Sequence, residues 1–249
     1  MASPSTAHMT ELSCRILDKN FFTEDIFELR IKAATGGNTH RFDYKPGQYA
    51  ILATGNHEAR PYSIAGMPGH DYLAFHIKDM GHGLSHELAN LKPGAEINVS
   101  YAGGDAYLQP KDHRPIIAIG GGLGLAPLIP IIDTALPLAP ERDIYLFHGG
   151  VTQRDLYMDQ TLTKRADHIP HLHYYGISET ANTIGESGVV GPVALRHLPQ
   201  DLSGFTAYLS GGPAMVLTTA ALLNDRGLDF DDMHSDALTE EVKKAGIPK

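Results

Sequence analysis

The feature that most constrains the fold of this chain is a change of sequence pattern near residue 112. Before it, short runs rich in β-branched and aromatic residues are broken by glycine, proline and asparagine, which is typical of an antiparallel barrel or sandwich. After it, Ile116 to Ile119 form a continuous apolar run, as expected of a strand buried on both faces of a parallel sheet. We therefore predict a β domain over residues 9–111 and an α/β domain over residues 112–249.

The elements expected in the two halves differ in kind. In the first half, strand candidates occupy residues 14–17, 26–31, 48–52, 72–77 and 96–99. In the second half, strand candidates at 116–119, 144–148, 171–175 and 206–210 alternate with helix-like segments at 125–136, 157–166, 193–197 and 214–224. Such alternation indicates βαβ units and a parallel sheet.

The composition excludes several classes of protein. A net charge of -9 argues against a surface for nucleic acid or anionic membrane. Cys14 is the only cysteine, so the chain forms no internal disulfide and cannot supply the four ligands of an iron–sulfur cluster. We expect Cys14 to be a buried small hydrophobe rather than a nucleophile.

Targeting signals are also missing from the sequence. No apolar run approaches the roughly 20 residues of a membrane span, and residues 1–9 lack the basic and apolar regions of a signal peptide. We expect a cytoplasmic protein whose residues 2–8 are a disordered leader or a cloning remnant.

The segment Arg60-Pro61-Tyr62-Ser63 combines a cation, a flat aromatic ring and a hydroxyl. Pro61 favours extended backbone at Arg60, so Arg60 and Tyr62 should project to the same side of a strand. A guanidinium can clamp a pyrophosphate, the tyrosine can cover an aromatic ring, and Ser63 can form a hydrogen bond with a ring nitrogen. The set suits a flavin. The alternative is a strand end with a surface arginine.

A second candidate anion site lies at Gly81 to Leu88, where a glycine loop opens a short helix that Lys92-Pro93-Gly94 should terminate. The N–H groups of a first helical turn carry partial positive charge, and Ser85 could cap them or share them with a phosphate. The alternative is an ordinary capped connector.

Two glycine-rich turns mark the second half. Gly120 to Pro127 follows the first buried strand and precedes a helix, so the backbone there can approach a diphosphate closely. Ser210 to Met215 repeats this design after the last strand candidate. Each turn alone could be merely a tight turn. Together, in one sheet, they imply a shared crevice at the carboxyl ends of the strands.

From about residue 12 to residue 238, the order of these motifs resembles the ferredoxin:NADP reductase superfamily, whose members join a flavin-binding barrel to a nicotinamide-nucleotide domain. Gly104-Asp105-Ala106-Tyr107-Leu108 looks most like bacterial NAD(P)H:flavin reductases and oxygenase reductase components that lack an iron–sulfur domain. The family's R-x-Y-S falls on Arg60, Tyr62 and Ser63, its G-G-x-G-x-x-P on Gly121, Gly122, Gly124 and Pro127, and its C-G-P-P-x-M on Ser210, Gly211, Gly212, Pro213 and Met215.

The resemblance implies roles for these residues. Arg60, beside Pro61, would meet the FAD pyrophosphate, Tyr62 would pack on the isoalloxazine, and Ser63 would lie near its N5 atom. Ser63 and Ser210 are therefore the expected catalytic residues. The strand His76-Ile77-Lys78 would line the flavin ring, mainly through its backbone, and Gly83, Leu84 and Ser85 would complete the pyrophosphate site.

Three departures from the family pattern affect the expected chemistry. Ser210 replaces the cysteine that borders the hydride-transfer position, although hydride transfer should still proceed. Val151 replaces a cation, which leaves Arg154 nearest to a ribose 2′-phosphate and favours NADH over NADPH. Many members of the family end with an aromatic residue stacked on the flavin, but no aromatic residue follows Phe230 here, and the corresponding stretch is 234–238. The uncovered face of the flavin ring would admit the nicotinamide.

The expected activity is that of an FAD-dependent NAD(P)H oxidoreductase. Hydride would pass from NADH, less readily from NADPH, to flavin N5, and electrons would then reach an acceptor, with a separate ferredoxin or oxygenase component among the candidate partners. The alternatives are a free-flavin reductase that uses flavin as substrate and a noncatalytic flavin-carrying subunit of a larger electron-transfer complex.

One further pattern is compatible with a metal site. His171 and His173 should face one side of a strand, as metal ligands can. Pro170 and the lack of a nearby cysteine or carboxylate cluster favour the start of a surface strand instead. We expect no metal.

Overall fold

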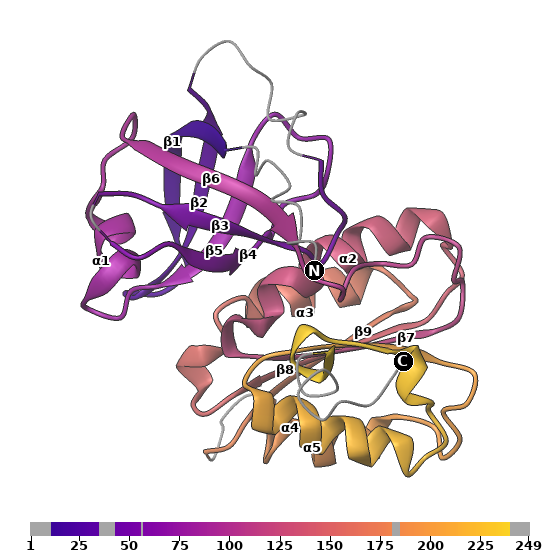
Figure 1. Ribbon diagram of the computed structural model, residues 1–249. Coiled ribbons are helices and arrows are strands. Elements are labelled where there is room, and N and C mark those ends of the chain that lie inside the picture. Colours follow the sequence, from indigo (N-terminus) through magenta and orange to yellow (C-terminus); the bar gives the residue numbers. More distant parts are fainter. Residues whose placement is uncertain (1–10, 35–42, 56, 181–184, 240–249) are drawn as a thin grey trace, which may run out of the picture. The chain divides into compact units, whose positions relative to one another are not determined.

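A computed structural model describes residues 11–34, 43–55, 57–180 and 185–239 of the chain (Figure 1). The chain divides into two compact units, one containing Gln48–Gly103 and the residues up to Tyr44, the other containing Lys45–Gly47 and the residues from Gly104 onward. The predicted fold class, an antiparallel β domain followed by a parallel α/β domain, is confirmed. No described helix is long and apolar enough to cross a membrane. The expected leader at residues 2–8 lies outside the described residues.

The first unit is a six-stranded antiparallel sheet in the order β4-β3-β6-β1-β2-β5. A bridge between Ile64 and Phe75 links the two ends of this order and closes the sheet into a barrel. The helix α1 (Gly83–Asn90) follows β5. The strands are β1 (Glu11–Phe21), β2 (Ile26–Ala33), β3 (Tyr49–Ala53), β4 (Arg60–Ser63), β5 (Leu73–Lys78) and β6 (Glu96–Gly103).

Alternation along the strands builds the core of this barrel. Phe27, Leu29 and Ile31 of β2 point inward and are fully buried, whereas the polar residues between them face outward. Cys14 belongs to the same core, and burial raises the pKa of its thiol to about 12. The expectation that Cys14 is a buried hydrophobe is confirmed.

The second unit is a parallel sheet in the order β10-β9-β8-β7-β11-β12. Helices α2 and α3 cover one face and α4 and α5 cover the other (Figure 1). The strands are β7 (Ile116–Gly121), β8 (Ile144–Gly150), β9 (Leu172–Ser178), β10 (Glu186–Ser187), β11 (Thr206–Ser210) and β12 (Met233–His234); the helices are α2 (Leu125–Leu138), α3 (Asp159–His168), α4 (Val190–His197) and α5 (Pro213–Asn224), with 3-10 helices η2 (Gly122–Gly124), η3 (Gln153–Asp155) and η4 (Phe230–Asp232).

The order of the strands fixes where a crevice opens. The chain adds β8 and then β9 on one side of β7, and later returns to place β11 on the other side. This reversal is the topological switch point at which open α/β sheets bind ligands, outside the carboxyl ends of the strands. Both glycine-rich turns begin there, because Ser210 of β11 pairs with Gly120 of β7.

Residues 104–111, which the sequence pattern placed in the barrel, pack with the second unit. The backbone N–H of Gln109 donates to the hydroxyl of Tyr208, at 3.0 Å, and that of Asp105 donates to the carboxylate of Asp236, at 2.8 Å. Residues 45–47 join them: the Leu108 N–H donates to the Pro46 carbonyl, at 2.9 Å. These partners are far apart in sequence, so no local pattern reveals them.

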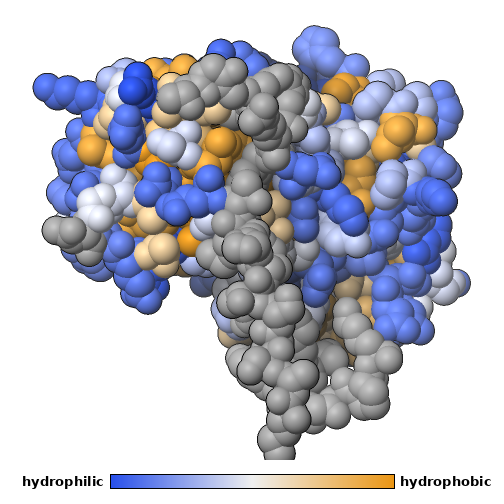
Figure 2. All heavy atoms as spheres, turned by 45° about the horizontal axis from the view of Figure 1, so that its top comes forward, coloured by the Kyte–Doolittle hydropathy of each residue, from blue (hydrophilic) through white to orange (hydrophobic). Residues whose placement is uncertain are grey.

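Large apolar side chains are also exposed at single positions. Phe21 and Met80 of the first unit are 52% and 60% exposed. On the face shown in Figure 2, apolar and hydrophilic residues are interspersed. Isolated exposed apolar residues of this kind are ordinary in folded proteins.

One network of ion pairs should make the free energy of unfolding depend on pH in the acid range. Arg114 Nη2 lies 2.8 Å from Asp112 Oδ2 and 2.7 Å from Asp232 Oδ1. Burial raises the pKa of Asp112, but the hydrogen bonds and charge of Arg114 outweigh it and lower that pKa. The hydrogen bond from Arg114 likewise lowers the pKa of Asp232. Such carboxylates stabilise the fold above their unfolded pKa, about 3.9, and the effect is lost as pH falls through the lower folded value.

We expect Arg114→Met to lower the free energy of unfolding by about 1 kcal/mol at pH 7, because solvent screens this partly exposed pair. The difference from the parent should shrink at pH 3. Urea unfolding at both pH values measures it. An equal difference at the two pH values would show that the loss comes from packing rather than charge.

Candidate functional site

The two glycine-rich turns of the second unit are packed against each other. A Cβ atom at Gly124 would collide with the carbonyl of Ser210, and one at Gly211 would lie 3.2 Å from the backbone nitrogen of Gly121. Only glycine allows backbones to approach this closely. The shared crevice expected from the sequence therefore has one continuous backbone rim.

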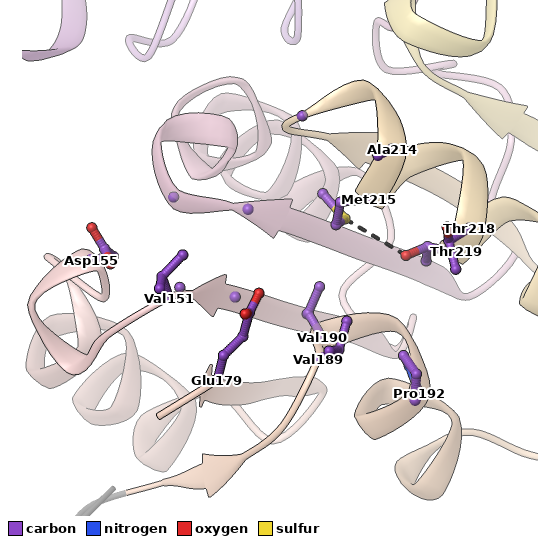
Figure 3. Close-up of a pocket in the computed structure, with 15 residues that line it drawn as sticks. Val151, Asp155, Glu179, Val189, Val190, Pro192, Ala214, Met215, Thr218 and Thr219 are labelled. Atoms are coloured by element: carbon purple, nitrogen blue, oxygen red, sulfur yellow. Dashed lines mark hydrogen bonds between the residues drawn. The ribbon is translucent and has the colours of Figure 1, made fainter. Parts of the chain in front are cut away.

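A pocket of about 530 Å³ opens at this rim (Figure 3). It extends from the ends of β7 and β8 to the start of α4 and the first two turns of α5. Its lining residues are Gly121, Gly122, Gly149, Gly150, Val151, Asp155, Glu179, Val189, Val190, Pro192, Gly212, Ala214, Met215, Thr218 and Thr219.

The predicted site residues of this half divide into those that line the pocket and those that support it. Gly121, Gly122, Gly212 and Met215 line it. The others lie outside the lining: Gly124, Ser210 and Gly211 form the contact between the turns, Pro213 is the first residue of α5, Pro127 is buried in the first turn of α2, and Arg154 is exposed on η3.

The rim offers backbone donors to an anion. Gly122 has a φ of 53°, and a Cβ there would meet no atom within 4 Å, so the space in front of it is open. At the start of α5, Gly212 makes no side-chain cap, and the first turn carries no acidic residue. The first N–H groups of α5 thus keep their partial positive charge, as anion sites at helix N-termini require.

The charged side chains of the pocket are both acidic. Asp155 Oδ2 accepts hydrogen bonds from the backbone and hydroxyl of Thr152, at 2.9 and 3.1 Å. The backbone of Glu179 is anchored by a hydrogen bond from its N–H to the Gly150 carbonyl, at 3.0 Å. Its carboxylate projects into the gap between Val151 and Val190 (Figure 3). Among the described lining residues, none is Lys, Arg or His.

Sequence reasoning missed most of the far wall of this pocket. Val151 and Val189 are 60% and 50% exposed and give the wall apolar surface. Glu179 joins the pocket lining because it directly follows β9, and the carboxyl ends of parallel strands lie at the same edge of a sheet. The end of the third buried strand was the signal that could have identified it.

In the first unit, β4 presents the predicted motif. Arg60 pairs across the sheet with Leu52, and its guanidinium is 61% exposed and lies 2.8 Å from the carboxylate of Glu58. Tyr62 packs partly against the barrel core, and this burial raises the pKa of its hydroxyl. Ser63, at the end of the strand, pairs with Tyr49.

The start of α1 has no side-chain cap. Its N-cap residue, His82, forms no capping bond, and Ser85 Oγ instead accepts the N–H of Met80 at 3.3 Å. The segment leading to Arg60 is attached to the same helix, because His57 Nε2 lies 2.8 Å from Glu87 Oε2. The motif on β4 and the glycine loop therefore belong to connected parts of one unit.

The side chains of β5 turn toward β2 or the core. His76 is buried, with its Nε2 3.7 Å from Glu28, and Lys78 lies 3.6 Å from Asp25. Ile77 is fully buried in the barrel core, and Leu84 of α1 is almost completely buried there. That this strand would line a flavin mainly through its backbone stays a prediction.

The two histidines weighed as metal ligands contact a carboxylate. His171 Nδ1 and His173 Nε2 lie 3.1 and 3.0 Å from the same oxygen of Asp143. The described residues contain no group of three His, Cys, Asp or Glu side chains that could hold a metal ion.

Comparison with known proteins agrees with this geometry. Residues 118–221 match the family described as the oxidoreductase NAD-binding domain. The chain is 33% identical over 219 residues to the ferredoxin–NAD(P)+ reductase component of the naphthalene 1,2-dioxygenase system of Pseudomonas putida, covering 86% of this chain and 65% of that protein. It thus spans about two thirds of that relative's length. A probable flavin reductase of Photobacterium leiognathi is 28% identical, with 86% and 99% covered.

A solved structure shares the whole two-unit architecture. The cytochrome P450 reductase GcoB of Amycolatopsis matches with a TM-score of 0.82 and 25% identity, covering 92% of this chain and 69% of that one. The motifs, the relatives and the fold therefore agree on one assignment. Over most of its length this chain is similar to members of the ferredoxin:NADP reductase superfamily.

Proposed function

We propose that this protein is an FAD-dependent NAD(P)H oxidoreductase that takes hydride from NADH and passes the electrons to an acceptor. The observation that carries the proposal is the pocket at the switch point of the parallel sheet, rimmed by two glycine turns that pack together. A nicotinamide dinucleotide needs such a backbone rim for its diphosphate. The NAD-binding family match covers the same residues.

The first unit supplies residues that fit FAD. The exposed guanidinium of Arg60 would clamp the pyrophosphate together with the uncapped N–H groups of α1 around Gly83 and Ser85. A Cβ at Gly83 would meet no atom within 4 Å, so the approach to these donors is open. Tyr62 offers a ring face for the isoalloxazine, and Ser63 a hydroxyl beside it.

The second unit would bind the nicotinamide nucleotide. Gly121, Gly122 and the start of α5 would hold the diphosphate, while Val151 and Val189 give apolar surface to a base. Ser210 and Gly212 would border the nicotinamide. A bound flavin supplies the chemistry of accepting a hydride and releasing its electrons onward. The protein then contributes orientation, and no general acid or base is required.

A visible spectrum of the purified protein tests this proposal. We expect a flavin band that bleaches when NADH is added without oxygen. A flavin band unchanged by either NADH or NADPH would instead support a noncatalytic flavin-carrying subunit.

A second function, reduction of free flavin as a substrate, is favoured by the match to 99% of a probable flavin reductase. The two functions differ in how tightly flavin is held. Gel filtration of the yellow protein separates them, because a substrate flavin is lost from the protein peak while a prosthetic FAD stays with it.

The acceptor belongs to the proposal as well. The relative from Pseudomonas putida is named as a ferredoxin reductase component of a dioxygenase system. We infer a separate ferredoxin or oxygenase component as the partner, and a cytoplasmic location for the pair.

The acidic pocket supports NADH as the donor. Glu179 and Asp155 would repel the 2′-phosphate of NADPH, whereas a carboxylate can accept a hydrogen bond from a ribose hydroxyl. We expect Glu179→Arg to shift the ratio of kcat/KM values toward NADPH by about tenfold or more, roughly 1.4 kcal/mol. Steady-state kinetics with both nucleotides measure it.

The matched control is Glu179→Gln, which removes the charge but adds no cation. It should shift the ratio in the same direction by a smaller factor. If Glu179→Arg leaves the ratio unchanged, the ribose lies away from Glu179 and Arg154 becomes the next residue to test.

A further inference from the structure

A buried histidine lies directly beneath the glycine turn of β7. His148 of β8 is fully buried and pairs in the sheet with Gly120 of β7. Its Nε2 lies 3.1 Å from the carbonyl oxygen of Gly122. His148 itself does not line the pocket, whereas Gly122 and the following residue of its own strand, Gly149, do.

The backbone at Gly122 has a conformation that depends on glycine. Its φ of 53° lies in the left-handed region, which glycine adopts freely. Its carbonyl also accepts the N–H of Leu125, at the start of α2. In a trans peptide the C=O and the next N–H point in opposite directions. A carbonyl held toward His148 therefore fixes the Leu123 N–H on the other side of the loop.

The imidazole is itself held in place. The ring of Tyr157, which is 9% exposed, meets it edge to face with centroids 5.5 Å apart. The carbonyl of Gly122 can only accept, so the contact requires a proton on Nε2 of His148. A buried donor of fixed direction can hold this peptide in one orientation.

We propose that His148 is a positioning residue for the nicotinamide nucleotide. Its Nε2–H donates to the Gly122 carbonyl and keeps the turn in the orientation that presents backbone N–H groups to a diphosphate. His148 acts through the turn and does not touch the ligand. This inference rests on the proposed function of the pocket as a dinucleotide site.

The test compares two substitutions in the flavin-loaded protein. His148→Phe keeps a ring against Tyr157 but removes the donor, whereas His148→Gln places an amide donor near the position of Nε2. Calorimetric titration with ADP-ribose, which carries the diphosphate without the nicotinamide, should show binding weakened about three- to tenfold in His148→Phe and largely restored in His148→Gln. The KM for NADH should rise likewise, with flavin reduction at saturating NADH nearly unchanged.

Each outcome decides a different point. If the parent does not bind ADP-ribose, the proposed function of the pocket fails. If the parent binds it and both variants bind equally well, or lose affinity equally, His148 has no positioning role. Nitrogen NMR of the unmodified protein adds a check that needs no variant: a neutral His148 with its proton on Nδ1 would overturn the proposal.

Discussion

Replacing Arg60 with alanine is expected to weaken FAD binding by about 10- to 100-fold, equivalent to about 1.5 to 3 kcal/mol for a charge-assisted hydrogen bond to the pyrophosphate. The guanidinium is largely exposed, and Glu58, with which it forms an ion pair, is itself a surface residue. Loss of this surface pair should therefore cost the fold little. Flavin fluorescence titration measures the affinity, and melting with saturating FAD measures the fold.

The chain offers a matched control for this substitution. Arg15 also lies on the barrel and forms an exposed pair with a glutamate, Glu96, at 3.2 Å. Arg15→Ala removes the same charge and should leave FAD affinity unchanged. If Arg60→Ala holds FAD as tightly as Arg15→Ala does, Arg60 does not bind the pyrophosphate.

Replacing Gly212 with valine is expected to slow flavin reduction by NADH by about 100-fold, because near-attack geometry tolerates little displacement of the reacting groups. A Cβ at Gly212 meets no protein atom within 4 Å, and the backbone there is extended at φ −62°. Valine should thus fit the fold and occupy space that the nucleotide needs. Stopped-flow bleaching under anaerobic conditions measures the rate.

The control for bulk alone is Gly204→Val. Gly204 also has open space around its position and lies outside the pocket lining. It should reduce flavin at the parental rate, and both variants should keep the parental flavin spectrum and affinity. Parental reduction kinetics in a folded Gly212→Val protein would place the nicotinamide elsewhere.

The fold was predictable because its strongest signals are local. The apolar run at Ile116 to Ile119 and the glycines after it define a buried strand and its turn within a few residues. The alternation of strands and helices then predicts a parallel sheet, whereas the order β9-β8-β7-β11 depends on contacts between residues far apart in sequence. The short strands β10 and β12 were not anticipated, since two residues carry no readable period.

The candidate site was predictable only where the backbone of the glycine turns forms it. Glycines at 121, 122 and 212 line the pocket. They were recognisable because a turn whose backbone approaches a ligand closely is rich in glycine, and that glycine run is visible in the sequence. Glu179 and Val189 leave none, because their place depends on which strand ends and helix starts meet at one edge. Proximity in sequence does not reveal the lining either: Arg154 follows Val151 by three residues but lies outside the pocket.

The three residues Lys45 to Gly47 have a consequence for engineering proteins of this fold. They sit inside the sequence of the first unit yet pack with the second, where Lys45 Nζ lies 3.8 Å above the ring of Tyr107 and a side chain at Gly47 would collide with Ala106. The boundary between the units is therefore crossed three times by the chain. A chimera that exchanges one unit through a single junction brings this tripeptide from one parent and its binding partners from the other. Compatible hybrids should transplant residues 45–47 together with everything after residue 103.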